Sequence, residues 1–99
     1  MAERAGWREI RDRRMAEPGA IEAYEASRLA FELGAAVRQM REQRGWTQAR
    51  LAEVASMTQP AVARFEAGGT VPTIPVLERL AHALGAKLVV QLASDGSAA

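Results

Sequence analysis

The chain has 99 residues, enough for one small domain. It is 48% hydrophobic and 25% charged. Its 13 Lys+Arg and 12 Asp+Glu leave a net charge of +1, which favours neither nucleic acid nor lipid as a binding partner. With no cysteine and one histidine, disulfides, thiolate chemistry and multi-histidine zinc sites are excluded. No apolar run reaches the roughly 18 residues of a membrane span, and the charged N-terminus is unlike a secretory signal. We expect a cytoplasmic, mostly helical domain that needs no metal or cofactor, binds no membrane and is not an enzyme.

Residues 1–19 form a charge-dense N-terminal extension. Trp7 and Ile10 lie one helical turn apart, and two apolar anchors are too few to bury a helix against a core. We expect a marginal helix that orders on a protein partner, through four candidate contacts: Trp7, Ile10, Arg11 and Arg14. The alternative is that Trp7 folds back onto the dimer partner or onto two aromatic residues of the next helix, Tyr24 and Phe31.

Residues 20–85 are predicted to be a helical domain. In the first helix, 20–44, Leu33, Val37 and Met40 keep the spacing i, i+4, i+7 of a core stripe. Leu29 and Phe31 do not share that face, so we expect either a bend or a second partner near residues 29–34. Three further helices are predicted at 48–55, 58–67 and 73–85, each preceded or opened by a threonine suited to the N-cap.

Residues 86–92 alternate apolar and polar positions, which is typical of a half-buried strand with Leu88, Val90 and Leu92 on one face. Nothing else in the sequence reads as a strand, and an unpaired strand leaves its backbone hydrogen bonds unmet. We therefore expect these residues to pair with the same strand of a second copy, making a homodimer. The alternative is irregular chain lying over the core. A disordered tail is expected at 93–99.

The stretch GWTQARLAEVASMTQPAVARFEAG, residues 45–68, carries the function. Two short helices meet through a tight turn, with Ala52 where they approach, which is a helix-turn-helix arrangement. Residues 33–85 resemble the XRE-type helix-turn-helix family, which includes phage repressors, so the fold implied is all-α and lambda-repressor-like. The flanking extension and the C-terminal KLVVQL further resemble HigA-type antitoxins. That resemblance implies a RelE- or HigB-like mRNA-cleaving toxin as a partner.

The family's geometry would place the second short helix in the major groove of operator DNA. Glutamine can pair with adenine, arginine with guanine, and small apolar groups can touch a thymine methyl, so we expect base contacts from Gln59, Pro60, Ala61 and Arg64. Phosphate oxygens are bound by the amides at helix starts, by hydroxyl groups, by free backbone amides and by arginine side chains. The candidates for phosphate contacts are Gln48, Thr58, Thr70, Gly69, Arg50 and Arg44. The resemblance also implies a structural ion pair between Arg41 and Glu66.

Two features of this sequence bear on affinity. Ser56 occupies a turn position that relatives fill with glycine, and a serine there costs about 1 kcal/mol if φ must be positive. Residues 46–70 contain two arginines and two glutamates and are neutral. One copy should therefore bind DNA weakly, and two copies on half-sites about 34 Å apart should bind well.

These observations favour a dimeric antitoxin that represses its own operon and neutralises the toxin. A stand-alone XRE-family repressor without a toxin is the main alternative. A protein-interaction adaptor that no longer reads DNA is another, favoured by the neutral charge around the second short helix.

Overall fold

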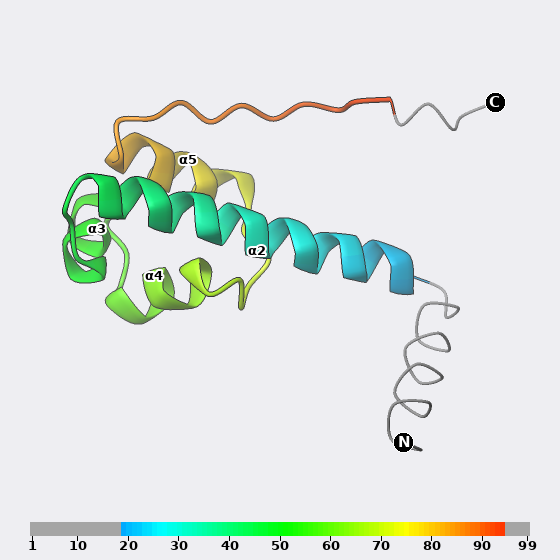
Figure 1. Cartoon of the computed structure of the whole chain (residues 1–99), viewed down its shortest axis with the longest axis horizontal. Coiled ribbons are helices and arrows are strands. Elements are labelled where there is room, and N and C mark those ends of the chain that lie inside the picture. The colour runs from blue at the N-terminus through cyan, green and yellow to red at the C-terminus, as the bar shows by residue number, and fades with distance from the viewer. Residues whose placement is uncertain (1–18, 95–99) are drawn as a thin grey trace, which may run out of the picture.

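The computed structural model describes residues 19–94, which form four helices joined by short connections. They are α2 (Ala20–Gln43), α3 (Gln48–Ala55), α4 (Gln59–Glu66) and α5 (Ile74–Ala83) (Figure 1). The regular structure in this range is all helical, as predicted for residues 20–85. The four extension residues expected to contact a partner lie outside the described residues: Trp7, Ile10, Arg11 and Arg14.

Three helices begin in the same way, at a threonine whose backbone is extended and whose hydroxyl caps the first turn. Thr47 accepts a hydrogen bond from the amide of Arg50 at 3.0 Å. Thr58 and Thr73 do the same for α4 and α5, at 3.3 and 3.4 Å from the amide three residues on. Each cap accepts a hydrogen bond from an amide that has no acceptor within the helix, which stabilises the fold by about 1 kcal/mol.

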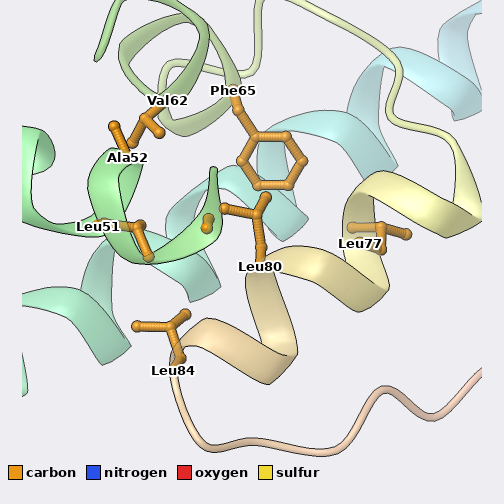
Figure 2. Close-up of a cluster of buried hydrophobic side chains, with 8 residues drawn as sticks. Leu51, Ala52, Val62, Phe65, Leu77, Leu80 and Leu84 are labelled. Carbon is orange, nitrogen blue, oxygen red and sulfur yellow. The ribbon is translucent and has the colours of Figure 1, made fainter. Parts of the chain in front are cut away.

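The hydrophobic core lies where α3, α4 and α5 meet beneath the C-terminal half of α2 (Figures 1 and 2). Its largest fully buried side chains come from the three short helices, and they are Phe65, Leu51, Leu80, Leu84 and Val62. Full burial of such a side chain is worth roughly 1.5–3 kcal/mol. Leu33, Val37 and Met40 of α2 pack against this cluster, so the predicted core stripe is where the sequence placed it.

The turn between α3 and α4 passes through Ser56, whose φ of 55° lies in the left-handed region. Among the non-glycine residues between 19 and 94, it is the only one with a positive φ. The local strain anticipated from the sequence is therefore present at this turn.

Helix α2 runs without interruption from Ala20 to Gln43, so of the two alternatives for residues 29–34, a bend or a second partner, the structure gives no support to the bend. Its buried residues begin at Ala30, and the first ten residues carry none. Figure 1 shows this N-terminal half extending beyond the other three helices. Leu29 and Phe31 depart from the core stripe because they are 51% and 64% exposed, not because the helix changes direction.

The predicted strand is not formed in a single copy of the chain, and residues 19–94 contain no strand. Residues 86–94 leave α5 as irregular extended chain (Figure 1). Leu88 packs partly against the core, while Val90 is 63% exposed and Leu92 is fully exposed. A strand needs a neighbour to satisfy its backbone groups, and one copy supplies none here.

Candidate nucleic-acid interface

Helix α4 is buried along one side and exposed at its first turn. Val62, Phe65 and Glu66 are buried, whereas Gln59 and Pro60 at its start are exposed. Three predicted base contacts, Gln59, Pro60 and Ala61, occupy the first turn, and Arg64 is exposed one turn further on. Pro60 lies in the first turn, where a missing backbone N–H costs little. The leading turn of α4 is thus presented to solvent by a helix that is anchored along its other side.

Arg41 of α2 and Glu66 of α4 form the ion pair that holds α4 in place. Arg41 Nε donates to Glu66 Oε2 at 2.7 Å and Nη2 donates to Oε1 at 3.0 Å, with the two side chains only 11% and 3% exposed. Arg41 Nη1 also donates to the carbonyl oxygen of Trp46 at 2.6 Å. The hydrogen bond to Glu66 raises the pKa of Arg41 above its ordinary value, despite the opposing effect of burial.

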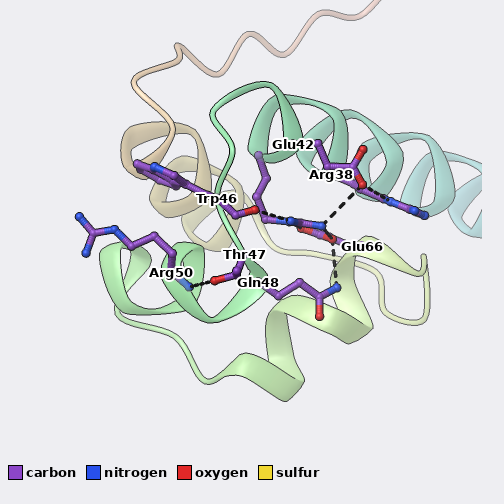
Figure 3. A network of polar contacts seen from close by, with 8 residues as sticks. Arg38, Glu42, Trp46, Thr47, Gln48, Arg50 and Glu66 are labelled. Atoms are coloured by element: carbon purple, nitrogen blue, oxygen red, sulfur yellow. Dashed lines mark hydrogen bonds and ion pairs between the residues drawn. The ribbon is translucent and has the colours of Figure 1, made fainter.

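Gln48 is a third member of this network, which the sequence did not indicate (Figure 3). Its Nε2 donates to Glu66 Oε1 at 3.1 Å, so the first residue of α3 is tied to the end of α4. A side-chain amide nitrogen carries two hydrogens. One is used by Glu66, and the second remains for the phosphate contact predicted for Gln48.

The network continues onto the solvent side of α2. Arg38 Nε donates to Glu42 Oε1 at 2.9 Å, and Glu42 also lies 3.9 Å from Arg41 Nη2. The hydrogen bond from Arg38 lowers the pKa of the Glu42 carboxyl. Within residues 19–94, no buried side-chain polar atom is left without a hydrogen-bond partner.

The backbones of α2 and α4 touch at Gly34. A Cβ atom placed there would lie 2.3 Å from the carbonyl oxygen of Phe65 and 2.9 Å from that of Glu66. Only glycine allows so close an approach. Gly34 therefore sets the distance at which α2 supports α4, next to the Arg41–Glu66 pair.

A model of the helix-turn-helix domain family matches residues 32–93, which is more than half of the chain. This chain belongs to that family, in its XRE/Cro-like kind. No curated protein and no solved structure matches the sequence. The turn of the DNA-binding helix-turn-helix is centred on Ser56, and α4 is its recognition helix.

Arg64 and Thr70 lie on either side of one open hollow beside the recognition helix. The hollow has a volume of about 240 Å³ and runs between α4 and the segment leading to α5. Thr58, Gly69 and Thr70 are all exposed on the helix-turn-helix. The structure thus brings a predicted base contact close to a predicted phosphate contact.

Arg44 and Arg50, the other two phosphate candidates, gather around Trp46 at the α2–α3 junction. Their guanidinium carbons lie 6.0 and 5.6 Å from the centre of the indole ring. Arg50 Nη1 is also 3.3 Å from Glu53 Oε1, and Trp46 packs partly against the core. Figure 3 shows Trp46 and Arg50 to one side of the network around Glu66. The two arginines therefore form a cluster apart from the recognition helix.

In the part of the chain that the structure describes, no helix is both long and apolar enough to cross a membrane.

Proposed function

We propose that the chain binds operator DNA in a sequence-specific manner, as a homodimer, and represses transcription. The observation that carries this proposal is the exposed leading turn of α4, with Gln59 and Pro60 open to solvent. A major groove is wide enough for one helix, and glutamine and arginine side chains on the exposed side of that helix can reach base edges.

The rigid support of α4 favours base reading over a general electrostatic attraction. Arg41, Gln48 and Gly34 fix its far end through two side-chain contacts and one backbone contact. Base recognition requires donors and acceptors held in a constant position, which such support supplies. The neutral charge of residues 46–70 makes purely electrostatic binding weak.

The homodimer is expected because one recognition helix reads few base pairs. Pairing of residues 86–92 across a two-fold axis would meet the backbone groups that a single copy leaves without strand partners. Val90 and Leu92 are both exposed in one copy, and contact with the partner strand would reduce their exposure to solvent.

We test the proposal with the DNA upstream of the chain's own gene, labelled and titrated against a shuffled duplex of equal length. Tight, salt-sensitive binding to the first and weaker binding to the second is expected. Equal binding to both duplexes would contradict sequence-specific reading. A dimer that binds neither would support the protein-interaction adaptor instead.

The narrower proposal is that this repressor is an antitoxin of the HigA type, with a RelE- or HigB-like toxin as its second partner. Its support is the layout noted in the sequence: a charged extension with Trp7 and Ile10, then the DNA-binding domain, then KLVVQL. Co-expression with the adjacent gene, followed by mass spectrometry of what co-purifies, separates it from a stand-alone repressor. Co-purification of a toxin supports the antitoxin, and its absence supports the plain repressor.

A further inference from the structure

The N-terminal half of α2 carries an exposed apolar stripe. Ile21, Tyr24 and Phe31 are 57, 56 and 64% exposed. Together with Arg28 they follow the spacing i, i+3, i+7, i+10, which lines the four side chains up along one face. This is the spacing of a coiled-coil contact, and we refer to Ile21, Tyr24, Arg28 and Phe31 as the α2 seam.

The single charge in the seam is already partnered within the helix. Arg28 Nη2 lies 2.9 Å from Glu25 Oε2, and Nη1 lies 3.2 Å from Glu32 Oε1. The two glutamates bind N–H groups at the edge of the Arg28 guanidinium, so its flat face can still stack on an aromatic ring. The seam therefore offers two aromatic rings, one aliphatic side chain and one neutralised arginine.

We propose that a second copy of this chain docks on the α2 seam, with the two α2 helices antiparallel about a two-fold axis that crosses the seam at the level of residue 26. In this register Ile21 packs against the partner's Phe31, and Tyr24 stacks on the partner's Arg28. Each contact occurs twice, as a two-fold interface requires. The inference rests on the proposed function, since it specifies how the DNA-binding dimer is built.

The direction of α4 from α2 fits this arrangement. At about 100° per residue, Gly34 and Arg41, which contact α4, lie roughly a quarter turn around the helix from the middle of the seam. The two-fold axis of an antiparallel helix pair is perpendicular to the plane that contains both helices. A quarter turn from the seam is the direction of that axis, so both recognition helices lie on the same side of the dimer.

The spacing along α2 fits as well. Gly34 is eight residues from Ala26, so the two α4 contact points are roughly 24 Å apart along the helix axes. Figure 1 shows α4 starting at the end of the molecule away from the overhanging half of α2. The leading turns are therefore further apart than the contact points, which is compatible with half-sites about 34 Å apart.

The C-terminal segment fits the same two-fold axis. In the view of Figure 1 it runs along α2 toward the overhanging half, on the side away from α4. Two such segments would pass each other antiparallel, as strand pairing requires. Complete cover of the exposed apolar residues of the seam and of this segment would bury at most about 700 Å² per copy, compared with about 800 Å² that each partner of a stable complex contributes.

Cross-linking tests the register directly, because the chain contains no cysteine. We would mix the single-cysteine variants Tyr24→Cys and Arg28→Cys and add a short thiol-to-thiol reagent. Cross-linked dimer containing one of each variant should exceed either same-variant dimer several-fold. Ile74→Cys mixed with Tyr24→Cys is the matched control, since Ile74 is 50% exposed on α5, and it should give no cross-link.

Oligomeric state provides the second measurement. Tyr24→Lys should weaken dimerisation of the full chain by about tenfold or more, while Ile74→Lys should leave it unchanged, as judged by light scattering. A dimer that resists Tyr24→Lys and cross-links only through Val90→Cys overturns the seam.

Two other outcomes also overturn the inference. A monomer in which Tyr24→Cys reacts slowly with a thiol reagent would mean that residues 1–18 of the same chain cover the seam. A monomer with a reactive thiol would leave the seam to a different protein. Titration of the same samples with the DNA upstream of the gene separates this inference from the proposed function. A chain that dimerises through another surface and still prefers the upstream DNA overturns the seam alone, whereas a chain that does not prefer the upstream DNA overturns the proposed function as well.

Discussion

Glu66 of the recognition helix and Arg41 of α2 share two hydrogen bonds, of 2.7 and 3.0 Å, between side chains that are nearly inaccessible to water. A buried guanidinium or carboxylate that loses its partner pays a desolvation cost that nothing offsets.

The variant Arg41→Met should therefore lower the free energy of unfolding by about 3 kcal/mol, because it leaves Glu66 buried without its main partner. Urea denaturation followed by circular dichroism measures this change. Arg38→Met is the matched control, since the substitution and helix are the same but the Arg38 side chain is 64% exposed. An equal decrease in the free energy of unfolding for the two variants would show that burial does not determine how much the Arg41–Glu66 pair stabilises the fold.

Gly34→Ala should destabilise the fold by about 2 kcal/mol, since the added methyl group would collide with the backbone of α4. The sign is informative, because glycine to alanine within an ordinary helix stabilises by about 1 kcal/mol. Ala36→Gly, at an exposed position of the same helix, should cost about 1 kcal/mol from helix propensity alone. A stabilising Gly34→Ala would contradict the close approach of α2 and α4.

Ser56→Gly should stabilise the protein by about 1 kcal/mol, because φ at this residue is 55° and glycine adopts that conformation without strain. Thermal unfolding would detect the rise in Tm. Ser27→Gly is the control: in the exposed first half of α2, the same change should destabilise. If both variants were destabilised, the left-handed turn at Ser56 would carry no strain.

Gln59→Ala and Arg64→Ala should each reduce discrimination between the upstream DNA and a shuffled duplex, by about 1–3 kcal/mol. Arg50→Ala should act differently if it contacts phosphate. It should weaken binding to both duplexes alike and reduce the slope of log affinity against log salt by about 1 per copy. Fluorescence anisotropy at several salt concentrations separates the two behaviours. Unchanged discrimination in both α4 variants would rule out base reading by this turn.

The helix boundaries could be predicted because the signals are local. Three threonine caps and the spacing of Leu33, Val37 and Met40 are visible in the sequence, and the structure places the helix ends within two residues of those expectations. The sequence leaves a bend or a second partner open at residues 29–34, because it does not show where the other helices end. In the structure α2 continues past them without a break, and Leu29 and Phe31 are exposed.

The network around Glu66 was harder to foresee. The family resemblance implies the role of Arg41, but the sequence indicates only a DNA contact for Gln48, because its hydrogen bond to Glu66 depends on how α3 and α4 cross. The role of Gly34 likewise depends on a contact between residues 31 positions apart, which no local pattern records. The pairing proposed for residues 86–92 would involve a second molecule, so a single copy of the chain does not test it.

The unbroken course of α2 has a consequence for regulation. A rigid rod supported at Gly34 transmits a tilt of its free end to the helix resting against that support. In the proposed dimer the second copy holds the chain near Ile21, roughly 20 Å from Gly34 along the rod, so the way the two copies meet would bear on the placement of α4. Operator affinity would then depend on a contact far from the side chains proposed to meet the duplex.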